Sequence, residues 1–213
     1  MKVYRDLVFR GSRPTLDRFV ADIEQRLTDG WTRYHTRERE VRRAALGAMY
    51  CFSCTAAGQR PASELWIATR PDGALYVSNV LASEYSSLTY DQYNAIIQEF
   101  HDCFALWAAH AAGVEVELGK ADLQIQDFLS ESTAKLLRNF SGHANRSTLH
   151  PLDRERWNQF LTAAHRDAAP LNASMLQRWL IEDEKWPEDE AINLAVEYEY
   201  ARDLLKVYES RPA

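Results

Sequence analysis

The segment from Phe140 to Trp157 gathers side chains that could act in catalysis or bind a ligand. Imidazole groups exchange protons near neutral pH, and guanidinium groups bind anions through several N–H donors. The catalytic candidates in and beside this segment are Arg138, His143, His150, Arg156 and His165, and the candidates for lining a ligand pocket are Asn145, Arg146 and Asp153.

A polar junction between two helices would use the same residues without any chemistry. His150 precedes Pro151 and is pushed towards an extended conformation, which is typical of a helix N-cap. Asp153 would then stand at the third helical position, where a carboxylate accepts hydrogen bonds from unpaired N–H groups. The sequence favours this junction and leaves a ligand or partner pocket as the alternative.

The pattern R-N-x-x-x-H runs from Arg138 to His143. It resembles the short signature of the HEPN ribonucleases, a family of helical, metal-independent RNA-cleaving proteins that usually work as dimers. The resemblance covers six residues, and it implies that His143 is the general acid and base. It also implies that Arg138 stabilises the phosphate and that Asn139 orients the pair. This hypothesis requires a helix unbroken through residues 138–143, with the Arg138 and His143 side chains in contact.

Cys51 and Cys54 have the spacing of a metal or redox motif, but their surroundings do not fit one. Zinc would need further Cys or His ligands at finger spacing, and a redox motif would need a helix to begin at the cysteines. We therefore predict two buried strand cysteines, no metal site and no cofactor. Cys103 follows His101 and Asp102, and adjacent helical residues point in different directions, so no catalytic triad is expected. The chain also lacks the phosphate-loop, dinucleotide, zinc-helix and esterase motifs.

Residues 31–45 carry a ladder of basic side chains. A strand is favoured over a helix here because the β-prone residues 47–55 follow and could pair with it. On a strand, one face would present Arg33, His35, Arg37, Arg39 and Arg43, with Glu38 and Glu40 on the opposite face. Alternate residues of a strand lie about 7 Å apart, which suits the phosphates of a nucleic acid backbone. Charge that protects an exposed sheet edge is the structural alternative.

The elements around these residues predict an α+β fold with an N-terminal antiparallel sheet covered by helices. The order is a strand at residues 2–9, a helix at 16–27, a hairpin turning at 70–73, a long helix capped at Thr89 and ending at Gly113, and an edge strand at 114–118. We assign these elements to an α+β domain spanning residues 1–119.

From about residue 120 the pattern becomes helical, and we predict a helical subdomain at 120–213 that packs on the first domain. Its helices begin near Ser130, Pro151, Asn172 and Pro187. The last of them repeats apolar residues at Leu194, Tyr198, Ala201, Leu205 and Tyr208, a seam that must pack on something.

Charge is unevenly distributed along the chain, whose net value is −6. Residues 1–60 carry +5, residues 61–170 carry −6 and residues 171–213 carry −5. The acidic face of the last helices comprises Glu182, Asp183, Glu184, Glu188, Asp189 and Glu190, and it argues against binding of double-stranded DNA. The charged N-terminal residues do not form a signal peptide, no apolar run is long enough to span a membrane, and three cysteines are no disulfide framework. A cytoplasmic protein is expected.

The leading functional hypothesis is a non-enzymatic binding protein of prokaryotic type, with an immunity, antitoxin or defence-accessory role. It would bind another protein through its acidic helical face and its basic strand. One alternative is a ribonuclease or other hydrolase that uses His143 with Arg138 or His150 with Arg156. Another is a small-molecule or nucleotide sensor at the junction of the two parts. RNA is a less favoured partner, and no membrane association is expected.

Overall fold

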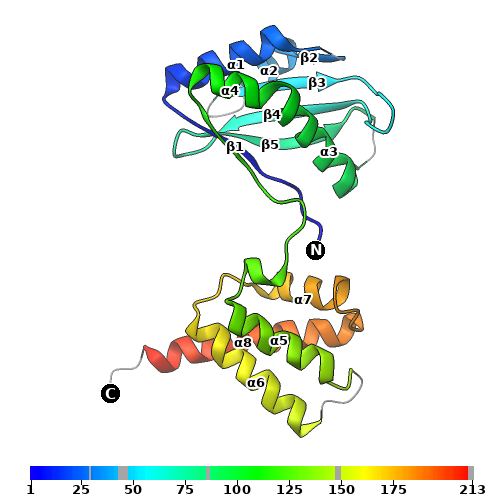
Figure 1. The fold of residues 1–213 in the computed structure, drawn as a ribbon, viewed down its shortest axis with the longest axis vertical. Helices are drawn as coiled ribbons and strands as arrows, with labels where there is room; N and C mark the ends of the chain where they lie inside the picture. The colour runs from blue at the N-terminus through cyan, green and yellow to red at the C-terminus, as the bar shows by residue number, and fades with distance from the viewer. Residues whose placement is uncertain (29, 43–47, 85–86, 147–149, 211–213) are drawn as a thin grey trace. The chain divides into compact units, whose positions relative to one another are not determined.

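A computed structural model describes residues 1–28, 30–42, 48–84, 87–146 and 150–210. The predicted surface residue Arg43 lies outside these ranges. The chain divides into two compact units (Figure 1). Lys2–Ala121 form one, called here the α/β unit, and Met1 with Asp122–Ala213 form the other, called the helical unit. None of the helices in the described part of the chain is long and apolar enough to cross a membrane.

The α/β unit contains a six-stranded sheet in which every neighbouring pair is antiparallel. The strands are β1 (Leu7–Arg10), β2 (Trp31–Arg33), β3 (Met49–Cys54), β4 (Ser63–Thr69), β5 (Leu75–Ala82) and β6 (Glu115–Leu118), in the spatial order β2-β3-β4-β5-β1-β6. The predicted edge strand is therefore confirmed as β6. Together with the helical second half of the chain, this sheet confirms the α+β class.

Helices α1 (Arg13–Arg26), α3 (Tyr90–Phe100) and α4 (Leu106–Ala112) cover one face of the sheet (Figure 1). The helix predicted from Thr89 to Gly113 is present, but a π-helical turn at His101–Ala105 separates α3 from α4. The Thr89 hydroxyl accepts from the Gln92 N–H at 3.2 Å, and the Gln92 side chain accepts from the Thr89 N–H at 3.0 Å. This is the predicted capping box.

The β4–β5 hairpin turns at residues 70–73, as the sequence predicts. Gly73 has φ of 88°, the left-handed region that glycine adopts without steric cost. Its N–H donates to the Arg70 carbonyl at 3.0 Å, and the Asp72 carboxylate accepts from the Ala74 N–H at 3.0 Å. The first strand, in contrast, is shorter than predicted. The Arg5 N–H donates to Asn94 of α3 at 2.9 Å, and β1 begins only at Leu7.

The strand predicted over residues 31–45 is wrong beyond Arg33, because His35–Arg42 form helix α2. Glu38 explains the helix. Its carboxylate is buried and accepts from Arg33 Nε at 2.8 Å and from the Cys51 N–H at 3.1 Å. On a continuing strand Glu38 would point to the face opposite Arg33, whereas one turn of helix lets the two side chains pair. A buried carboxylate needs such partners.

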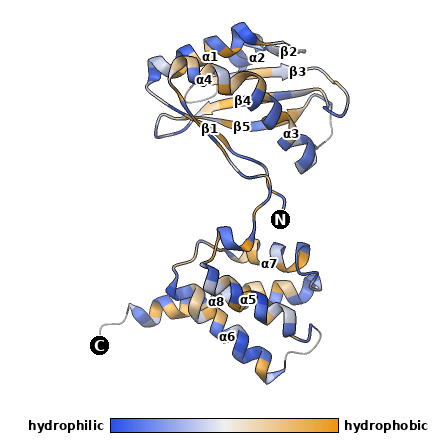
Figure 2. Ribbon diagram, viewed as in Figure 1, coloured by the Kyte–Doolittle hydropathy of each residue, from blue (hydrophilic) through white to orange (hydrophobic). Residues whose placement is uncertain are grey.

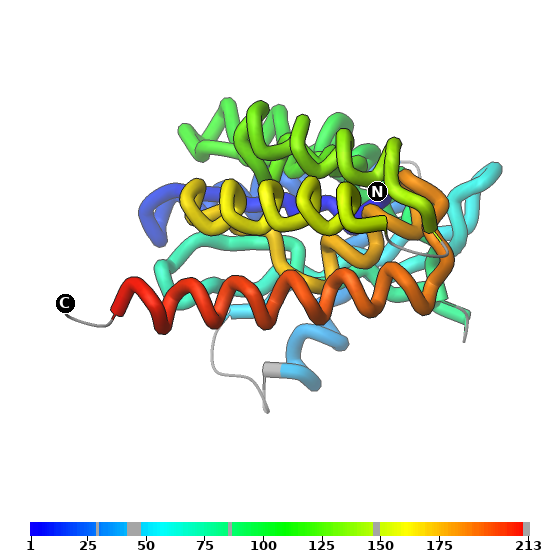
Figure 3. The backbone as a smooth tube through the Cα atoms, turned by 90° about the horizontal axis from the view of Figure 1, so that it is seen from below, coloured from blue at the N-terminus to red at the C-terminus, as the bar shows by residue number. Residues whose placement is uncertain are grey.

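The helical unit contains α5 (Glu131–His143), α6 (Pro151–Arg166), α7 (Ala173–Glu182) and α8 (Glu188–Glu209), preceded by a short 3-10 turn at Ile125–Asp127. Ser130 and Asn172 cap α5 and α7 through their side chains, as predicted. Trp157, Phe140, Phe160 and Tyr198 meet in the core, with ring centroids 4.8–5.8 Å apart. Figure 3 shows α6 running between α5 and α8.

Candidate functional site

The polar segment after Phe140 is organised around Asp153, whose side chain is almost fully buried at the start of α6. Its carboxylate accepts from the N–H groups of Asn145 at 3.2 Å and His150 at 3.1 Å, and from Arg156 Nη1 at 2.8 Å. The His150 ring in turn accepts from the Leu152 N–H at 3.3 Å. Four of the predicted site residues thus form a capping cluster, which satisfies the first turn of a helix.

Burial alone would raise the pKa of Asp153, but its hydrogen bonds from Asn145 and His150 and the charge of Arg156 lower that pKa below its usual value. The carboxylate is therefore held ionised, as a cap requires. A general acid needs the opposite shift. The geometry suits a structural role for Asp153.

Arg138 and His143 lie on an unbroken helix, because α5 runs through Gly142 to His143. Five residues correspond to about 140° around a helix, so the two side chains leave α5 on different sides. His143 Nδ1 lies 2.9 Å from the Asn139 carbonyl one turn earlier and can donate to it. Among the described residues, no hydrogen bond or ion pair joins Arg138 to His143. The helix that the ribonuclease hypothesis requires is present, and the contact is not.

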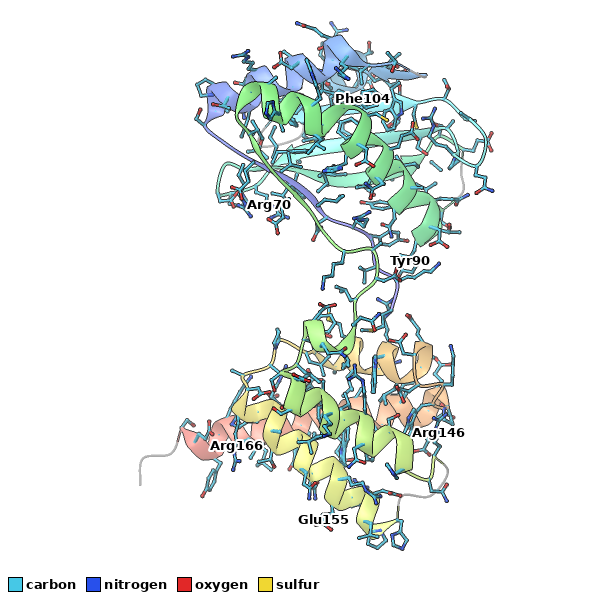
Figure 4. The ribbon with its side chains drawn as sticks, in the orientation of Figure 1. Arg70, Tyr90, Phe104, Arg146, Glu155 and Arg166 are labelled. Carbon is cyan, nitrogen blue, oxygen red and sulfur yellow. The ribbon has the colours of Figure 1, made fainter. Side chains whose placement is uncertain are left out.

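The other predicted pocket residues lie apart from Asp153. Arg146 donates to the Lys185 carbonyl at 3.0 Å and stands over the Trp186 ring, and it is labelled in Figure 4. His165, near the end of α6, lies 3.0 Å from the Glu209 carboxylate. The structure therefore distributes these side chains over two separate contacts.

The basic residues of the predicted ladder are largely paired with acids. Arg33 bonds both Glu38 and Glu24, the latter at 2.7 Å, and His35 Nε2 lies 2.6 Å from Glu24. Burial alone would lower the pKa of Arg33, but these carboxylates raise it. Arg37 pairs with Glu40 at 3.2 Å and Arg33 with Glu38, so the expectation that Glu38 and Glu40 lie on the face opposite the basic ladder is wrong. Arg39 is exposed and contacts Thr36.

Half of the residues of the predicted acidic face form contacts with other residues of the helical unit. Glu182 pairs with Arg178 at 2.9 Å, and Glu184 accepts from the Ser141 hydroxyl at 2.7 Å. Asp183 lies 3.3 Å from the Met1 nitrogen. The acids Glu188, Asp189 and Glu190 form the first turn of α8, where the helix dipole favours negative charge.

Cys51 and Cys54 are free, buried cysteines on β3, as predicted. Burial raises the pKa of Cys51 to about 12, which leaves the thiol protonated and unreactive. The expectation that His101 and Asp102 diverge is wrong, because His101 Nδ1 lies 2.6 Å from Asp102 Oδ1. Both belong to the π-helical turn, whose wider winding changes the angle between successive side chains. Cys103 is exposed.

Sequence reasoning missed the outer face of α8, where large apolar side chains are exposed to solvent. They recur at steps of four, four, four and three residues and are 38–67% exposed. We call this set the α8 stripe: Ile192, Val196, Tyr200, Leu204 and Val207. Hydrophobic residues accordingly recur along the whole of α8 in Figure 2.

The α8 stripe lies opposite the face that α8 buries. At 3.6 residues per turn, the stripe spans an arc of about 120° centred roughly half a turn from Leu194 and Tyr198. Those two residues are each 2% exposed. The predicted seam is buried at these positions and becomes exposed towards Tyr208, which is 77% exposed. Glu199 is exposed at one edge of the stripe, and Asp203 is exposed within its arc.

A second surface feature lies over α5 and α6. A shallow groove of about 680 Å³ is lined by Leu136 of α5 and by Arg154, Asn158, Gln159 and Arg166 of α6 among others. A neighbouring hollow of about 600 Å³ shares Leu136 and is lined by Lys135 and Arg138. We call the two together the α5–α6 groove.

Comparison with models of protein families, with curated proteins and with solved structures found no match. The two surfaces of the helical unit are the features of the molecule that indicate a function.

Proposed function

We propose that this chain is a non-catalytic protein-binding module and that the α8 stripe is its docking surface. The observation that carries the proposal is the second apolar face of α8. Taking about 200 Å² for a fully exposed large side chain, the stripe exposes roughly 500 Å² of surface. Exposed apolar patches of several hundred Å² mark interaction sites, and a standard interface buries about 800 Å² on each partner.

The charges beside the stripe indicate the chemistry of the partner. Glu199 lies at the edge of the stripe and Asp203 within its arc. Residues 173–209 carry ten Asp and Glu against four Lys and Arg. Charge complementarity speeds encounter and selects between partners. We infer an apolar groove on the partner with Lys and Arg at its rim.

The same proposal places this binding role in the cytoplasm of a prokaryote. The free cysteines among the described residues suit a reducing compartment. An immunity protein or antitoxin acts by covering a surface of another protein, and a stripe of this kind supports that role.

Site-specific photocross-linking in cells that naturally express the protein tests the proposal. A photoreactive phenylalanine replaces Tyr200 in the stripe, and the control replaces Tyr34, which is 43% exposed on the α/β unit. Peptide mapping should show a defined adduct from position 200 alone, on a segment containing both apolar and basic residues. The additional change Leu204→Asp should remove the adduct. The same adducts from both positions would contradict the proposal.

Catalysis is tested separately with purified protein and labelled RNA. We expect no turnover, and His143→Ala should change nothing. RNA cleavage that is lost in His143→Ala would refute the non-catalytic assignment and favour the ribonuclease hypothesis.

A further inference from the structure

The α5–α6 groove resembles the partner surface inferred for the α8 stripe, because its lining combines an apolar residue with Lys and Arg. Both of its halves are lined in part by Leu136, a partly buried apolar residue. Basic side chains also line the two halves: Lys135 and Arg138 on α5, Arg154 and Arg166 on α6. Arg166 and the acidic lining residue Glu155 are labelled towards opposite ends of α6 in Figure 4.

Three of these cations are available to a partner. Lys135, Arg138 and Arg166 are exposed, and within the described ranges none of their side chains forms a hydrogen bond or ion pair. Arg154 differs, because its Nη1 lies 2.5 and 2.7 Å from the two carboxylate oxygens of Glu197 on α8. The lining of the groove thus combines unpaired positive charge with the apolar side chain of Leu136.

Within the helical unit, the helices that carry the two surfaces have net charges of opposite sign. Residues 131–166, which include α5 and α6, carry six Lys and Arg against three Asp and Glu, a net charge of +3. Residues 173–209, which include α7 and α8, carry a net charge of −6. Figure 3 shows α6 between α5 and α8, so the groove and the stripe belong to different helices of the same chain.

We infer that the groove receives the α8 stripe of a second copy of this chain. This inference rests on the proposed function of the stripe and identifies the partner of the stripe as another copy of the chain. Tyr200 and Leu204 of one copy would pack on Leu136 of the next. Glu199 and Asp203 would lie beside Arg138 and Arg166. Because the two surfaces differ, the contact is heterologous and builds a closed ring or an open chain of copies.

Two other occupants fit less well. Direct packing of α8 against α8 would bring the acids of both copies together, with Lys206 as the main cation beside the stripe. A nucleic acid on the groove would meet the phosphate-binding cations but also Leu136, Glu155 and the −6 charge of residues 173–209. Both become outcomes of the test.

The test measures the mass of the full chain by sedimentation at protein concentrations from about 1 to 100 µM. The stripe variant is Tyr200→Asp with Leu204→Asp, and the groove variant is Arg138→Glu with Arg166→Glu. All four positions are exposed, so circular dichroism should be unchanged. The controls are Leu106→Asp, which is matched to Leu204 in exposure at 52% against 53%, and Arg18→Glu with Arg39→Glu.

The wild-type mass should rise with concentration, and each double variant should weaken the association at least about tenfold while the controls do not. An equimolar mixture of the two double variants should form a heterodimer, since the groove of one and the stripe of the other are intact. About 0.5 M salt should weaken every complex.

Three results would overturn the inference. A wild-type chain that stays monomeric throughout excludes the second copy, while the photocross-link at position 200 still tests the proposed function. Loss of association in the stripe variant alone, without rescue by mixing, assigns the contact to paired α8 helices. Nucleic acid that co-purifies with the wild type and not with the groove variant assigns the groove to phosphate.

Discussion

Helices α3 and α8 both cover a hydrophobic core, but they differ in what they leave outside. In α3 the large apolar residues Tyr93, Ile96, Ile97 and Phe100 are buried. Its outer positions are polar and used locally, as in Glu99, which accepts from Trp31 Nε1 at 2.9 Å. In α8 a buried apolar face and an exposed apolar face stand back to back.

The difference separates a helix that the fold alone explains from one that it does not. Burial of one apolar stripe is what a surface helix needs in order to pack. A second stripe adds nothing to the packing of the isolated unit and keeps apolar surface in water, which is unfavourable. The second stripe of α8 is therefore best explained by something that covers it.

Matched truncations on the two faces of α8 should have the largest effect. Leu194→Ala, on the buried face, should lower the free energy of unfolding of the helical unit by about 2–5 kcal/mol through the cavity it leaves. Leu204→Ala, on the stripe, should change it by no more than about 0.5 kcal/mol. Hydrogen exchange of the α7 and α8 amides measures both values in the full chain.

The measurement is made at a concentration where the chain is monomeric, so that association does not contribute. Equal costs at the two positions would mean that the stripe is packed within the chain, and the contrast between α3 and α8 would disappear.

The Asp153 cluster predicts a pH dependence of intermediate size. The folded-state pKa of Asp153 is lowered, so its contribution to stability is fully present above the unfolded-state pKa of about 3.9. That contribution is lost as the pH falls through the lower, folded-state value. Asp153→Asn should have a lower melting temperature than the wild type at neutral pH. The difference between the two melting temperatures should become smaller in acid.

Thermal melts from neutral to acidic pH compare this variant with Glu155→Gln, an exposed acid on the same helix. The control should follow the wild type throughout. A constant difference between Asp153→Asn and wild type at every pH would show that the charge of Asp153 does not stabilise the cluster.

The fold was more predictable than the surfaces because its signals are local. Thr89 with Gln92, or His150 with Asp153, specify a helix start within four residues. The sequence did not indicate that β2 ends at Arg33. That end depends on the hydrogen bond from the Cys51 N–H to the Glu38 carboxylate, which joins residues distant in sequence. For the same reason the sequence did not show which acids of the acidic face are paired, since only the fold brings Glu184 to Ser141.

The α8 stripe was visible in principle. Its four-residue steps can be read from Ile192 onwards, but the overlapping seam through Leu194 and Tyr198 is equally regular. Two interleaved stripes make a helix look apolar all round, and the sequence does not tell which stripe faces the core. That choice depends on Phe160 and the rest of the core, against which Tyr198 stacks.

The smallest effect concerns the ion pair that links α6 to the flank of α8. Arg154 and Glu197 are 51% and 35% exposed, so water screens their attraction. A double-mutant cycle with Arg154→Ala and Glu197→Ala should give a coupling of about 0.2–1 kcal/mol, and salt should reduce it. Hydrogen exchange of the helical unit in the monomeric chain provides the four free energies.

This weak coupling matters for the comparison because Glu197 lies close to the stripe and Arg154 lines the groove. If the Arg154–Glu197 pair contributes little to the free energy of unfolding, both side chains can pair with residues of a second copy instead. The fold would lose little stability. A coupling above about 2 kcal/mol would mean instead that the fold itself requires this charge pair. The electrostatic match between the two surfaces would then rest on Glu199, Asp203, Arg138 and Arg166 alone.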